Sequence, residues 1–339
     1  RTLLKLTCEK HYTLANLLIS FYKWYSKNVN KSVIKENITI DDIVFMAKKQ
    51  SEMEEGEFKL SVVVPNYNYE KFLYQRIYSI LYQKEKISEL IILDDCSKDN
   101  SRELIDEIVE KTKDYINIKK VYNETNSGTA FKQWEKGFKE ATGDYVWIAE
   151  ADDYCDNKFL KTVLKPIKND NDIVISYCDT AFIDKMGNVI LKSIKQEIDI
   201  MKTGHWDSDF VNEGSKEIKD YSFLNCTIAN VSSVIFKNNN YSKYFKLAGK
   251  YRQCGDWLFY VKVMNDGKIS YVDKTFNYYR VHGSNVTSLT KKQKHFDEIK
   301  LVHNEIDKMY KFDKKQKSEI NKRYKFLRRV WSLDDEKDK

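Results

Sequence analysis

The spacing of the hydrophobic positions along the chain changes close to residue 58. Upstream of it, apolar side chains at helical spacing predict a first helix, namely Leu14, Leu17, Leu18, Phe21 and Tyr25. A second short helix is expected after Asp41, and the charged stretch Ser51–Glu57 is interpreted as a linker. We therefore expect residues 1–57 to form a separate helical extension. Because the chain opens with Arg1 rather than Met, we also expect it to be cut from a longer protein with other domains.

From residue 60 onward, short apolar runs alternate with helical segments. The predicted strands are Leu60–Val64, Leu90–Leu93, Ile118–Tyr122 and Tyr145–Ala149, and the helices between them are Tyr69–Gln83, Ser101–Lys111 and Phe131–Ala141. Strands that are apolar throughout and alternate with helices are typical of a parallel sheet covered on both faces. Farther on, we expect a strand at Ile173–Ile183 that turns into a hairpin, an irregular stretch over 191–225, a helix near Asp256–Asn265 and a strand near Ile269–Val272. The predicted fold class is α/β, with a mixed, mostly parallel sheet flanked by helices.

Polar residues follow each of the first four predicted strands. The clusters are Asn66-Tyr67-Asn68, Asp94-Asp95, Asn126-Ser127-Gly128 and Glu150-Ala151-Asp152-Asp153. Ligands of parallel sheets bind beyond the carboxyl ends of the strands, so these clusters are expected at one edge. Crowding the three carboxylates of the last cluster costs free energy unless a cation neutralises them, which favours a divalent ion shared with a phosphate ligand. The alternative is an acidic loop in which an aspartate caps the next helix.

Composition narrows the classes of function. The 339 residues suffice for one large domain with appendages or for two domains, and the sequence holds no apolar run long enough to predict a transmembrane helix. Most of the net charge of +7 lies in residues 291–339, which hold 16 Lys and Arg against 10 Asp and Glu. The remainder is close to neutral, which argues against a nucleic-acid-binding protein. The six cysteines include no CxxC pair, so reduced thiols in a cytoplasmic protein are the simplest interpretation.

Taken in order, several motifs resemble those of the family 2 glycosyltransferases, which have the GT-A fold. The motifs are Val64-Pro65-Asn66-Tyr67-Asn68, Ile92-Leu93-Asp94-Asp95-Cys96-Ser97-Lys98-Asp99-Asn100-Ser101, Asn126-Ser127-Gly128, Gly143-Asp144-Tyr145, Glu150-Ala151-Asp152-Asp153 and Gly255-Asp256-Trp257. The resemblance spans about residues 58–285 and implies a nucleotide-sugar donor bound over the carboxyl edge of the sheet. It predicts a GT-A domain over residues 58–290, followed by a basic helical extension over 291–339.

The resemblance also implies which residues bind the donor, namely Pro65, Tyr67, Asn68, Asp95, Gly128, Lys132, Glu150 and Asp153. Tyr67 would stack on the nucleoside base and Asp95 would accept a hydrogen bond from it, while Lys132 would reach the diphosphate. A flat ring and a fixed acceptor can read a uracil-like edge, so UDP is the expected nucleotide, with dTDP and GDP as alternatives. Two alternatives remain open, namely that Tyr67 is a buried aromatic of the loop and that Lys132 is a solvated side chain on the surface. For Asp94 and Asp99, turn formation or helix capping explains the residue as well as a role in donor binding does.

Two residues are implied as metal ligands, Asp152 and His282. Asp152 stands where the family carries a metal-binding aspartate, and His282 lies in a Tyr-Arg-x-His segment similar to one that related enzymes carry. Glu150 departs from the commoner aspartate, so its contact is expected to be longer or through water. The expected ion is Mn²⁺ or Mg²⁺, which would bridge the two phosphates and stabilise charge on the leaving group. The alternative for His282 is a structural role.

Asp256 is the candidate general base. In inverting enzymes of this type a carboxylate removes the proton of the acceptor hydroxyl as its oxygen attacks the anomeric carbon, with no covalent intermediate. The alternative is an N-cap, because Gly255-Asp256 precedes an apolar helical run. Trp257 is predicted either to form part of the acceptor wall or to pack in the core.

We therefore predict an inverting, metal-dependent glycosyltransferase that acts on a glycan or lipid-linked acceptor in surface polysaccharide biosynthesis. The alternatives are a catalytically silent GT-A scaffold that binds a glycan or nucleotide, and a sugar nucleotidyltransferase. The latter needs a basic, Gly-rich loop after its first strand, which Asn66–Glu70 does not provide. The basic tail is expected either to contact an anionic membrane surface from the cytoplasm or to pack on the catalytic domain.

Overall fold

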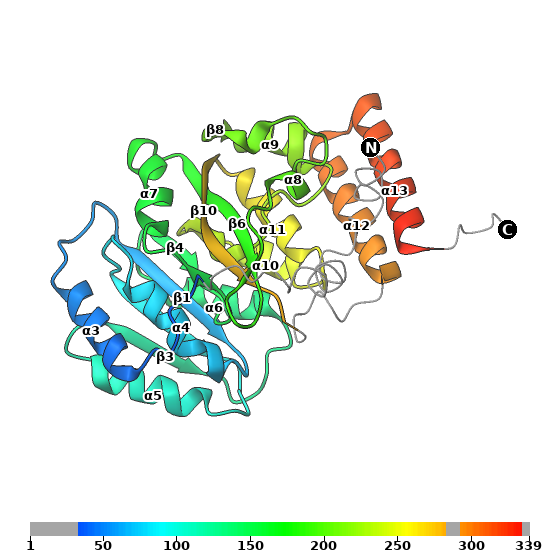
Figure 1. Ribbon diagram of the computed structural model, residues 1–339. Coiled ribbons are helices and arrows are strands. Elements are labelled where there is room, and N and C mark those ends of the chain that lie inside the picture. The colour runs from blue at the N-terminus through cyan, green and yellow to red at the C-terminus, as the bar shows by residue number, and fades with distance from the viewer. Residues whose placement is uncertain (1–32, 283–291, 334–339) are drawn as a thin grey trace.

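The computed structural model describes residues 33–282 and 292–333 (Figure 1). The predicted helix over residues 14–25 lies outside the described residues. In the described part of the chain, ten strands form one sheet in the order β3-β2-β1-β4-β9-β6-β10-β5, with β7 paired to β6 and β8 to β10. The strands are β1 (Leu60–Asn66), β2 (Glu89–Asp94), β3 (Ile118–Tyr122), β4 (Tyr145–Ile148), β5 (Tyr154–Cys155), β6 (Ile173–Ile183), β7 (Val189–Leu191), β8 (Phe210–Glu213), β9 (Val234–Lys237) and β10 (Lys268–Arg280).

The α-helices flank this sheet and extend beyond it at one end of the molecule (Figure 1). They are α3 (Ile40–Ser51), α4 (Glu70–Leu81), α5 (Ser101–Thr112), α6 (Ala130–Glu140), α7 (Phe159–Asn169), α8 (Lys195–Ile198), α9 (Gly214–Glu217), α10 (Ser242–Ala248), α11 (Gly255–Met264), α12 (Lys292–Tyr310) and α13 (Lys314–Trp331).

Strand direction brings the functional residues to one edge. β1 pairs in parallel with β2 and β4, β2 with β3, and β6 with β10. β9 lies antiparallel between β4 and β6, so β4 and β6 also point the same way. The carboxyl ends of β1, β2, β3, β4, β6 and β10 therefore share one edge of the sheet. The predicted mixed, mostly parallel sheet is confirmed.

The two faces of the sheet are covered by different helices, as the alternation of side chains along β1 shows. Val62 and Val64 lie in one apolar cluster with residues of α3, α4, α5 and α7. Val63 lies in the other cluster, with residues of α6, α10 and α11. The packing of α6 on β1 is tight at Gly137, where an added Cβ would lie 2.4 Å from Val63 Cγ1. Such an approach admits no side chain, which explains a glycine inside a helix.

The helices on either side of the predicted GT-A domain pack into its cores. Ile43 and Ala47 of α3 are fully buried beside the strands. Apolar residues of α12 are also buried, with Val302 and Ile306 at 0 % exposure in the same cluster as α11. α12 and α13 lie side by side (Figure 1), and His303 Nδ1 of α12 is 2.8 Å from Tyr324 Oη of α13. Of the helices described, none has the length and apolar character needed to span a membrane.

The second half of the domain differs most from the prediction. The hairpin is confirmed, because β6 turns through Gly187, with φ of 85°, into antiparallel β7. The strand expected near Ile269–Val272 continues to Arg280 as β10, with register shifts between Val272 and Asn277. The polar residues at those shifts interrupt the apolar run, so the sequence pattern does not predict the second part of the strand. Residues 191–225, predicted to be irregular, hold the short elements α8, β8 and α9 together with a 3₁₀ turn and a π turn.

Candidate active site

Asp95, just after β2, lies in a cage of hydrogen-bond donors. Its side chain accepts from Asn123 Nδ2 (2.6 Å), the Ser127 amide (2.8 Å) and Gln133 Nε2 (2.9 Å), all on Oδ1. Oδ2 accepts from Ser127 Oγ at 2.7 Å. A carboxylate oxygen offers about two lone pairs, so Oδ1 is fully engaged while Oδ2 keeps capacity for a further donor. The loops after β2 and β3 thus hold one rigid acceptor at the sheet edge.

Asp94 and Asp99 stabilise the loop after β2. Arg102 Nε donates to Asp94 Oδ1 at 2.7 Å, and the Ser97 amide donates to the same atom at 3.1 Å. Burial raises the pKa of Asp94, but the donors from Ser97 and Arg102 outweigh it and hold that pKa below its ordinary value. Asp99 accepts from the Ser101 amide (3.1 Å) and from the Glu70 amide (3.0 Å), at the starts of α5 and α4. The structure supports the turn-forming interpretation for both.

The residues predicted to contact the base differ in accessibility. Pro65 is buried within β1, whereas the Tyr67 side chain is 43 % exposed, so the alternative of a buried loop aromatic is wrong for Tyr67. Asn68 adopts a left-handed backbone with φ of 59°. Its amide donates to Ser97 Oγ at 2.9 Å and its Oδ1 accepts from the Lys98 amide at 2.7 Å. Asn68 therefore joins the loops after β1 and β2, and Tyr67 presents an open ring beside them.

Gly128 and Lys132 belong to the loop and first turn that lead into α6. Gly128 has φ of 83°, a left-handed conformation that favours glycine, and an added Cβ would meet nothing within 4 Å. Thr129 caps α6 by accepting from the Phe131 amide. The Lys132 side chain is exposed and its Nζ donates to the Ser127 carbonyl at 2.9 Å. The structure thus places the Lys132 ammonium on the same loop that encloses Asp95; its contact with a diphosphate stays a prediction.

Glu150 is the first of the three carboxylates after β4. Its Oε1 accepts from Trp134 Nε1 of α6 at 2.7 Å, and its amide donates to Ser232 Oγ at 3.1 Å. Burial raises the pKa of Glu150 to about 8, with the Asp152 carboxylate adding to the rise and Trp134 opposing it. Glu150 is therefore largely protonated at neutral pH in the absence of a cation.

Asp153 is the most enclosed of the three, with 1 % exposure. Its Oδ2 accepts from Asn230 Nδ2 (3.0 Å) and Ser232 Oγ (2.7 Å), and its Oδ1 accepts from the Arg280 amide at 3.0 Å. Burial, followed by the Asp152 charge, raises the pKa of Asp153 to about 6. These contacts tie the loop after β4 to β10 and to the turn before β9. Its contact with a donor, predicted from the sequence, stays a prediction.

Asp152 meets His282 at the same edge, with 2.9 Å between Asp152 Oδ2 and His282 Nε2. The contact between Asp152 and His282 follows from the topology, because β4 and β10 end at the same edge of the sheet. The Arg280 guanidinium holds the arrangement by donating from Nε to the Asp152 carbonyl at 2.7 Å. The His282 ring contacts those of Tyr69 and Phe72, each at 5.6 Å between centroids. The structure thus brings together the two residues predicted as metal ligands.

This pair fits a hard divalent cation. Mg²⁺ and Mn²⁺ favour carboxylate and water oxygens, and Mg²⁺ is commonly held by one or two carboxylates together with substrate phosphates. Asp152 supplies a carboxylate with 7 % of the residue exposed, and His282 supplies an imidazole nitrogen next to it. Within residues 33–282 and 292–333, no group of three or more His, Cys, Asp or Glu side chains forms a complete metal site.

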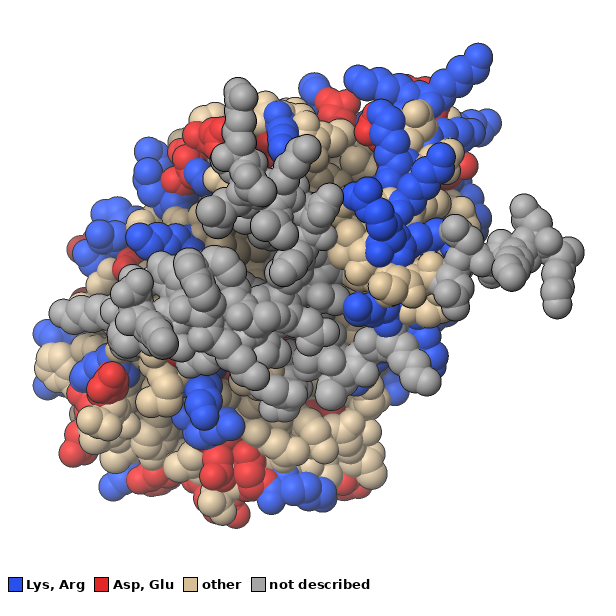
Figure 2. Space-filling model, turned by 45° about the vertical axis from the view of Figure 1, so that its right-hand side comes forward, with Lys and Arg blue, Asp and Glu red and all other residues tan. Residues whose placement is uncertain are grey.

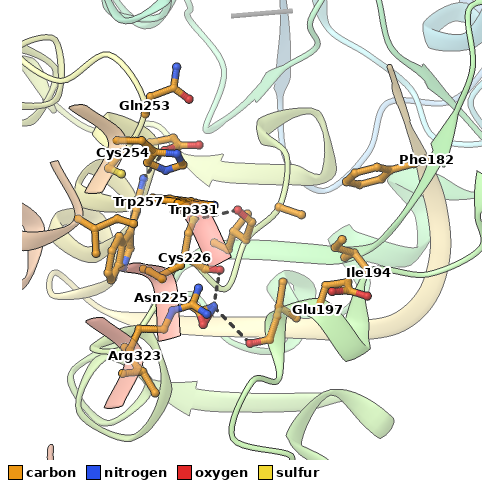
Figure 3. Close-up of a pocket in the computed structure, with 18 residues that line it drawn as sticks. Phe182, Ile194, Glu197, Asn225, Cys226, Gln253, Cys254, Trp257, Arg323 and Trp331 are labelled. Carbon is orange, nitrogen blue, oxygen red and sulfur yellow. Dashed lines mark hydrogen bonds between the residues drawn. The ribbon is translucent and has the colours of Figure 1, made fainter. Parts of the chain in front are cut away.

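Asp256 lies in the first turn of α11 and lines a cavity of about 260 Å³. Figure 3 shows this cavity with Cys254 and Trp257, on either side of Asp256 in the chain, labelled. Its Oδ1 accepts from the Trp257 amide at 2.8 Å, and burial is the main cause that raises the pKa of Asp256 to about 6. Cys254 is the N-cap of α11, so the alternative that places Asp256 at the cap is wrong in position. A carboxylate in the first turn still gains from the helix dipole.

The rest of the cavity wall comes from distant parts of the chain. Trp257 lies beside Asp256, Asn225 comes from the segment before β9, and His295 and Trp331 come from α12 and α13. Trp257 is 3 % exposed and its Nε1 donates to the Ser222 carbonyl at 2.8 Å, so it packs in the core and also lines the cavity. Burial lowers the pKa of His295 to about 4, which makes its imidazole neutral at physiological pH.

Helix α6 links the cavity to the acidic cluster. Trp134 donates to Glu150, and its ring packs at 4.9 Å from the ring of Phe131. Phe131 in turn lies against Gly255, where an added Cβ would be 2.6 Å from Phe131 Cε2. Asp256 follows directly in the chain. One short path of contacts therefore joins the sheet edge to the start of α11.

The sequence analysis missed several residues that hold this site together. Arg280 is fully buried, and besides its contacts with the acidic loop it donates from Nη2 to Gln75 Oε1 at 3.0 Å. Ser232 supports both Glu150 and Asp153. Arg76 is also fully buried, with its guanidinium 4.9 Å from the Trp147 ring centre, and its charge lowers the pKa of Glu150 and Asp153. An arginine within an apolar strand or helix is the one signal that could have indicated such roles.

Comparison with known protein sequences agrees with this picture. The sequence pattern of "Glycosyl transferase family 2" matches residues 61–215. An uncharacterized glycosyltransferase of Methanocaldococcus jannaschii, MJ1057, is 31 % identical over 239 residues, which are 69 % of this chain and 75 % of that protein. An uncharacterized glycosyltransferase of Haemophilus influenzae is 35 % identical over 143 residues, 42 % of this chain. The match spans about half the length of the latter protein, 55 %.

Two solved structures share the fold. Residues 1–349 of Staphylococcus aureus TarS, a poly(ribitol-phosphate) β-N-acetylglucosaminyltransferase, in complex with UDP-GlcNAc match with a TM-score of 0.52 at 20 % identity, over 81 % of this chain and 73 % of that one. The mannosyltransferase PcManGT of Pyrobaculum calidifontis, in complex with GDP-Man and Mn²⁺, matches with a TM-score of 0.54 at 14 % identity, over 94 % of this chain and 84 % of that one. At these identities the likeness establishes the GT-A fold alone.

Proposed function

We propose that this chain, which belongs to glycosyltransferase family 2, transfers a sugar from a nucleotide-diphosphate sugar to an acceptor hydroxyl with inversion at the anomeric carbon. The observation that carries the proposal is the shared edge of the sheet. There a caged acceptor, Asp95, follows β2, and the pair Asp152–His282 follows β4 and β10. Contacts of α6 link this edge to a cavity that is lined by a half-buried carboxylate, Asp256.

The donor is proposed to be a UDP-sugar. The unfilled acceptor capacity of Asp95 Oδ2 suits the imide N–H of uracil, and the open ring of Tyr67 offers a stacking surface. The relative TarS has been crystallised with UDP-GlcNAc, which favours UDP, whereas PcManGT binds GDP-Man. Gly128 leaves room for close approach to the sheet edge, and Lys132 supplies a positive charge beside it.

Asp152 and His282 would hold the divalent cation, and Glu150, which accepts a hydrogen bond from Trp134 of α6, would contact the ion at a longer distance or through water. Such an ion, when bound, neutralises the diphosphate as the sugar–phosphate bond breaks. Asp153 and Arg280 would keep the acidic loop in place through the hydrogen bond between them and through the hydrogen bond from Arg280 to the Asp152 carbonyl. The Mn²⁺ in the PcManGT complex supports a divalent ion for the fold, and we propose Mn²⁺ or Mg²⁺ here.

Asp256 is proposed as the general base. The acceptor oxygen attacks the anomeric carbon, the bond from that carbon to the diphosphate oxygen breaks with its electron pair, and the hydroxyl proton passes to an Asp256 oxygen. Burial suits the group to this task, because a base with a pKa of about 6 is ionised at pH 7 yet accepts a proton more readily than an ordinary aspartate. The cavity beside it would take the acceptor.

We propose a surface glycan or a lipid-linked precursor as the acceptor, in line with TarS, and a cytoplasmic reaction at the inner face of the membrane. The free thiols at all five cysteines of the described residues suit that compartment. α13 carries eight Lys and Arg against one Glu, and its apolar residues Ile320, Leu327 and Trp331 face the protein. The opposite face exposes Lys314, Lys317, Lys322 and Lys325, which we propose contact anionic lipid. Figure 2 shows Lys and Arg side chains gathered at the end of the molecule that α12 and α13 form.

The stereochemistry of donor hydrolysis tests this proposal without knowledge of the acceptor. UDP-GlcNAc is an α-linked donor, and water can replace the acceptor hydroxyl. With Mn²⁺ present, NMR spectra recorded before mutarotation should show β-GlcNAc as the first product. The Asp256→Asn variant should still bind UDP while its turnover falls by roughly 10²–10⁴-fold. A first product in the α form would overturn the inverting mechanism, and an unchanged rate in the variant would overturn the role of Asp256.

A further inference from the structure

The carboxylate of Glu298 accepts hydrogen bonds from three consecutive backbone amides. The Arg252 amide donates to Oε1 at 2.8 Å, and the amides of Gln253 and Cys254 donate to Oε2 at 2.7 and 3.0 Å. Glu298 lies on α12, more than 40 residues along the chain from this loop and outside the segment that matches the family. Hydrogen bonds to an ionised acceptor are roughly twice as strong as neutral ones, so this is a firm attachment.

The loop that Glu298 holds is the approach to α11. Cys254 is the N-cap of that helix and its own side chain makes no capping hydrogen bond. The backbone donors ahead of the helix are thus satisfied by a side chain from α12 rather than by a local residue. Asp256, the proposed base, follows two residues after Cys254 in the first turn.

The start of α11 has little freedom on its other side. At Gly255 an added Cβ would lie 2.5 Å from the Ala248 carbonyl oxygen and 2.6 Å from Phe131 Cε2. Asp256 Oδ1 is held by the Trp257 amide at 2.8 Å. The helix start is therefore fixed by close packing against α10 and α6 on one side, and by Glu298 on the other.

We propose that Glu298 is a positioning residue that sets the place of Asp256 through the loop 252–254. The inference rests on the proposed role of Asp256 as the base. Glu298 itself touches neither substrate nor reacting atom. It follows that α12 is part of the catalytic unit, even though it comes from the C-terminal extension.

Amide hydrogen exchange tests the attachment in the free protein. In Glu298→Gln the amide side chain keeps a single, uncharged acceptor oxygen, so a peptide covering residues 250–257 should exchange at least about tenfold faster than in the wild type. The control is Asp297→Asn, the exposed neighbour on α12 whose side chain, in the described part of the chain, accepts one hydrogen bond, from Gln293. Equal exchange in Glu298→Gln and the wild type would overturn the attachment.

Kinetics then test the positioning role. With UDP-GlcNAc, Mn²⁺ and water as acceptor, Glu298→Gln should lower kcat on the order of 10–100-fold, as a small misplacement of a catalytic group does, while KM for the donor stays within about twofold. Glu298→Asp, which keeps the charge, should recover part of the loss, and it decides the question if Glu298→Gln does not fold. A loss shared equally between kcat, donor KM and thermal stability would show a merely structural residue and overturn the proposal.

The double variant separates this inference from the assignment of the base. If Glu298 acts through Asp256, then adding Glu298→Gln to Asp256→Asn should cause no further loss of turnover. Full activity in Asp256→Asn would refute the base, and with it this inference. An inactive Asp256→Asn together with a fully active Glu298→Gln would refute the positioning role alone.

Discussion

Burial decides how the carboxylates of this site can act. Glu150 and Asp153 both have raised pKa values, of about 8 and about 6, because each is withdrawn from water next to Asp152. Two buried arginines, Arg76 and Arg280, lie close enough to offset part of that cost. The two arginines therefore reduce the cost of placing three acidic residues together at a strand end.

The pKa of Asp256 gives a prediction for the pH profile. Burial raises that pKa to about 6, and the base acts in its ionised form, so kcat/KM should fall tenfold per pH unit as the pH drops below about 6. Initial rates of UDP release between pH 4.5 and 8 check this. The affinity for UDP, measured separately, should stay constant as the pH passes through about 6. A rate that stays flat down to pH 5 would contradict the assignment.

The pairing of Asp152 with His282 could be predicted from the sequence, because both motifs follow strands and parallel strands bring such ends together. The residues that hold the acidic loop in place could not be predicted in this way. Ser232 and Asn230 lie in a polar turn with no distinctive spacing, and they reach Asp153 only through the antiparallel placement of β9. Glu298 shows in the sequence only as a charged residue on an amphipathic helix, and its role depends on how α12 docks.

At the scale of elements, α6 contacts several parts of the site and holds them together. Its first turn follows the Asp95 loop, Trp134 in its middle reaches Glu150, and its packing on β1 depends on Gly137. The helix was predicted from sequence to within one residue at each end, because its apolar spacing is regular. β10 was predicted only in part, since polar residues at its irregular pairings break the apolar run that marks a buried strand.

A substitution at Gly137 tests the close packing of α6 on β1. The Cβ in Gly137→Ala would meet Val63 Cγ1 at 2.4 Å, so we expect the free energy of unfolding to fall by about 1–3 kcal/mol, as overpacking does. Urea unfolding measures it. Gly56→Ala is the matched control, because its nearest contact, the Phe58 carbonyl oxygen, lies at an ordinary 3.6 Å. Equal stability of the two variants would mean that the sheet and helix yield more easily than the structure indicates.

At the scale of the whole molecule, the extensions described on either side of the predicted GT-A domain pack into its cores. α3 packs into one core, and α12 and α13 pack into the other and line the cavity beside Asp256. The predicted boundaries at residues 57 and 290 lie near the limits of the family resemblance, which spans about residues 58–285. Apolar packing continues across those positions, because an extension with apolar side chains is stabilised when it packs against exposed apolar surface of the neighbouring domain.

The basic face of α13 yields a prediction about membrane contact. Each Lys near an anionic bilayer contributes about 1 kcal/mol, so reversing Lys314, Lys317, Lys322 and Lys325 to Glu should weaken binding to vesicles containing phosphatidylserine by at least about 100-fold. Sedimentation with vesicles at low and physiological salt measures this. The control reverses four exposed lysines elsewhere, Lys48, Lys111, Lys161 and Lys165. Equal losses in both variants would show an effect of net charge, and no binding by the wild type would refute the membrane contact.

The most direct test of the account is calorimetric titration of UDP into the wild type and into Asp152→Ala, each with and without Mn²⁺. The account predicts that Mn²⁺ tightens UDP binding by at least about tenfold in the wild type, because the proposed ligands Asp152 and His282 would hold the ion where it neutralises the diphosphate. The gain should vanish in Asp152→Ala, whose metal-free affinity should match that of the wild type. UDP affinity that is the same with and without Mn²⁺, or a gain that survives in Asp152→Ala, would contradict the proposed metal site, and no binding of UDP under any condition would contradict the donor site itself.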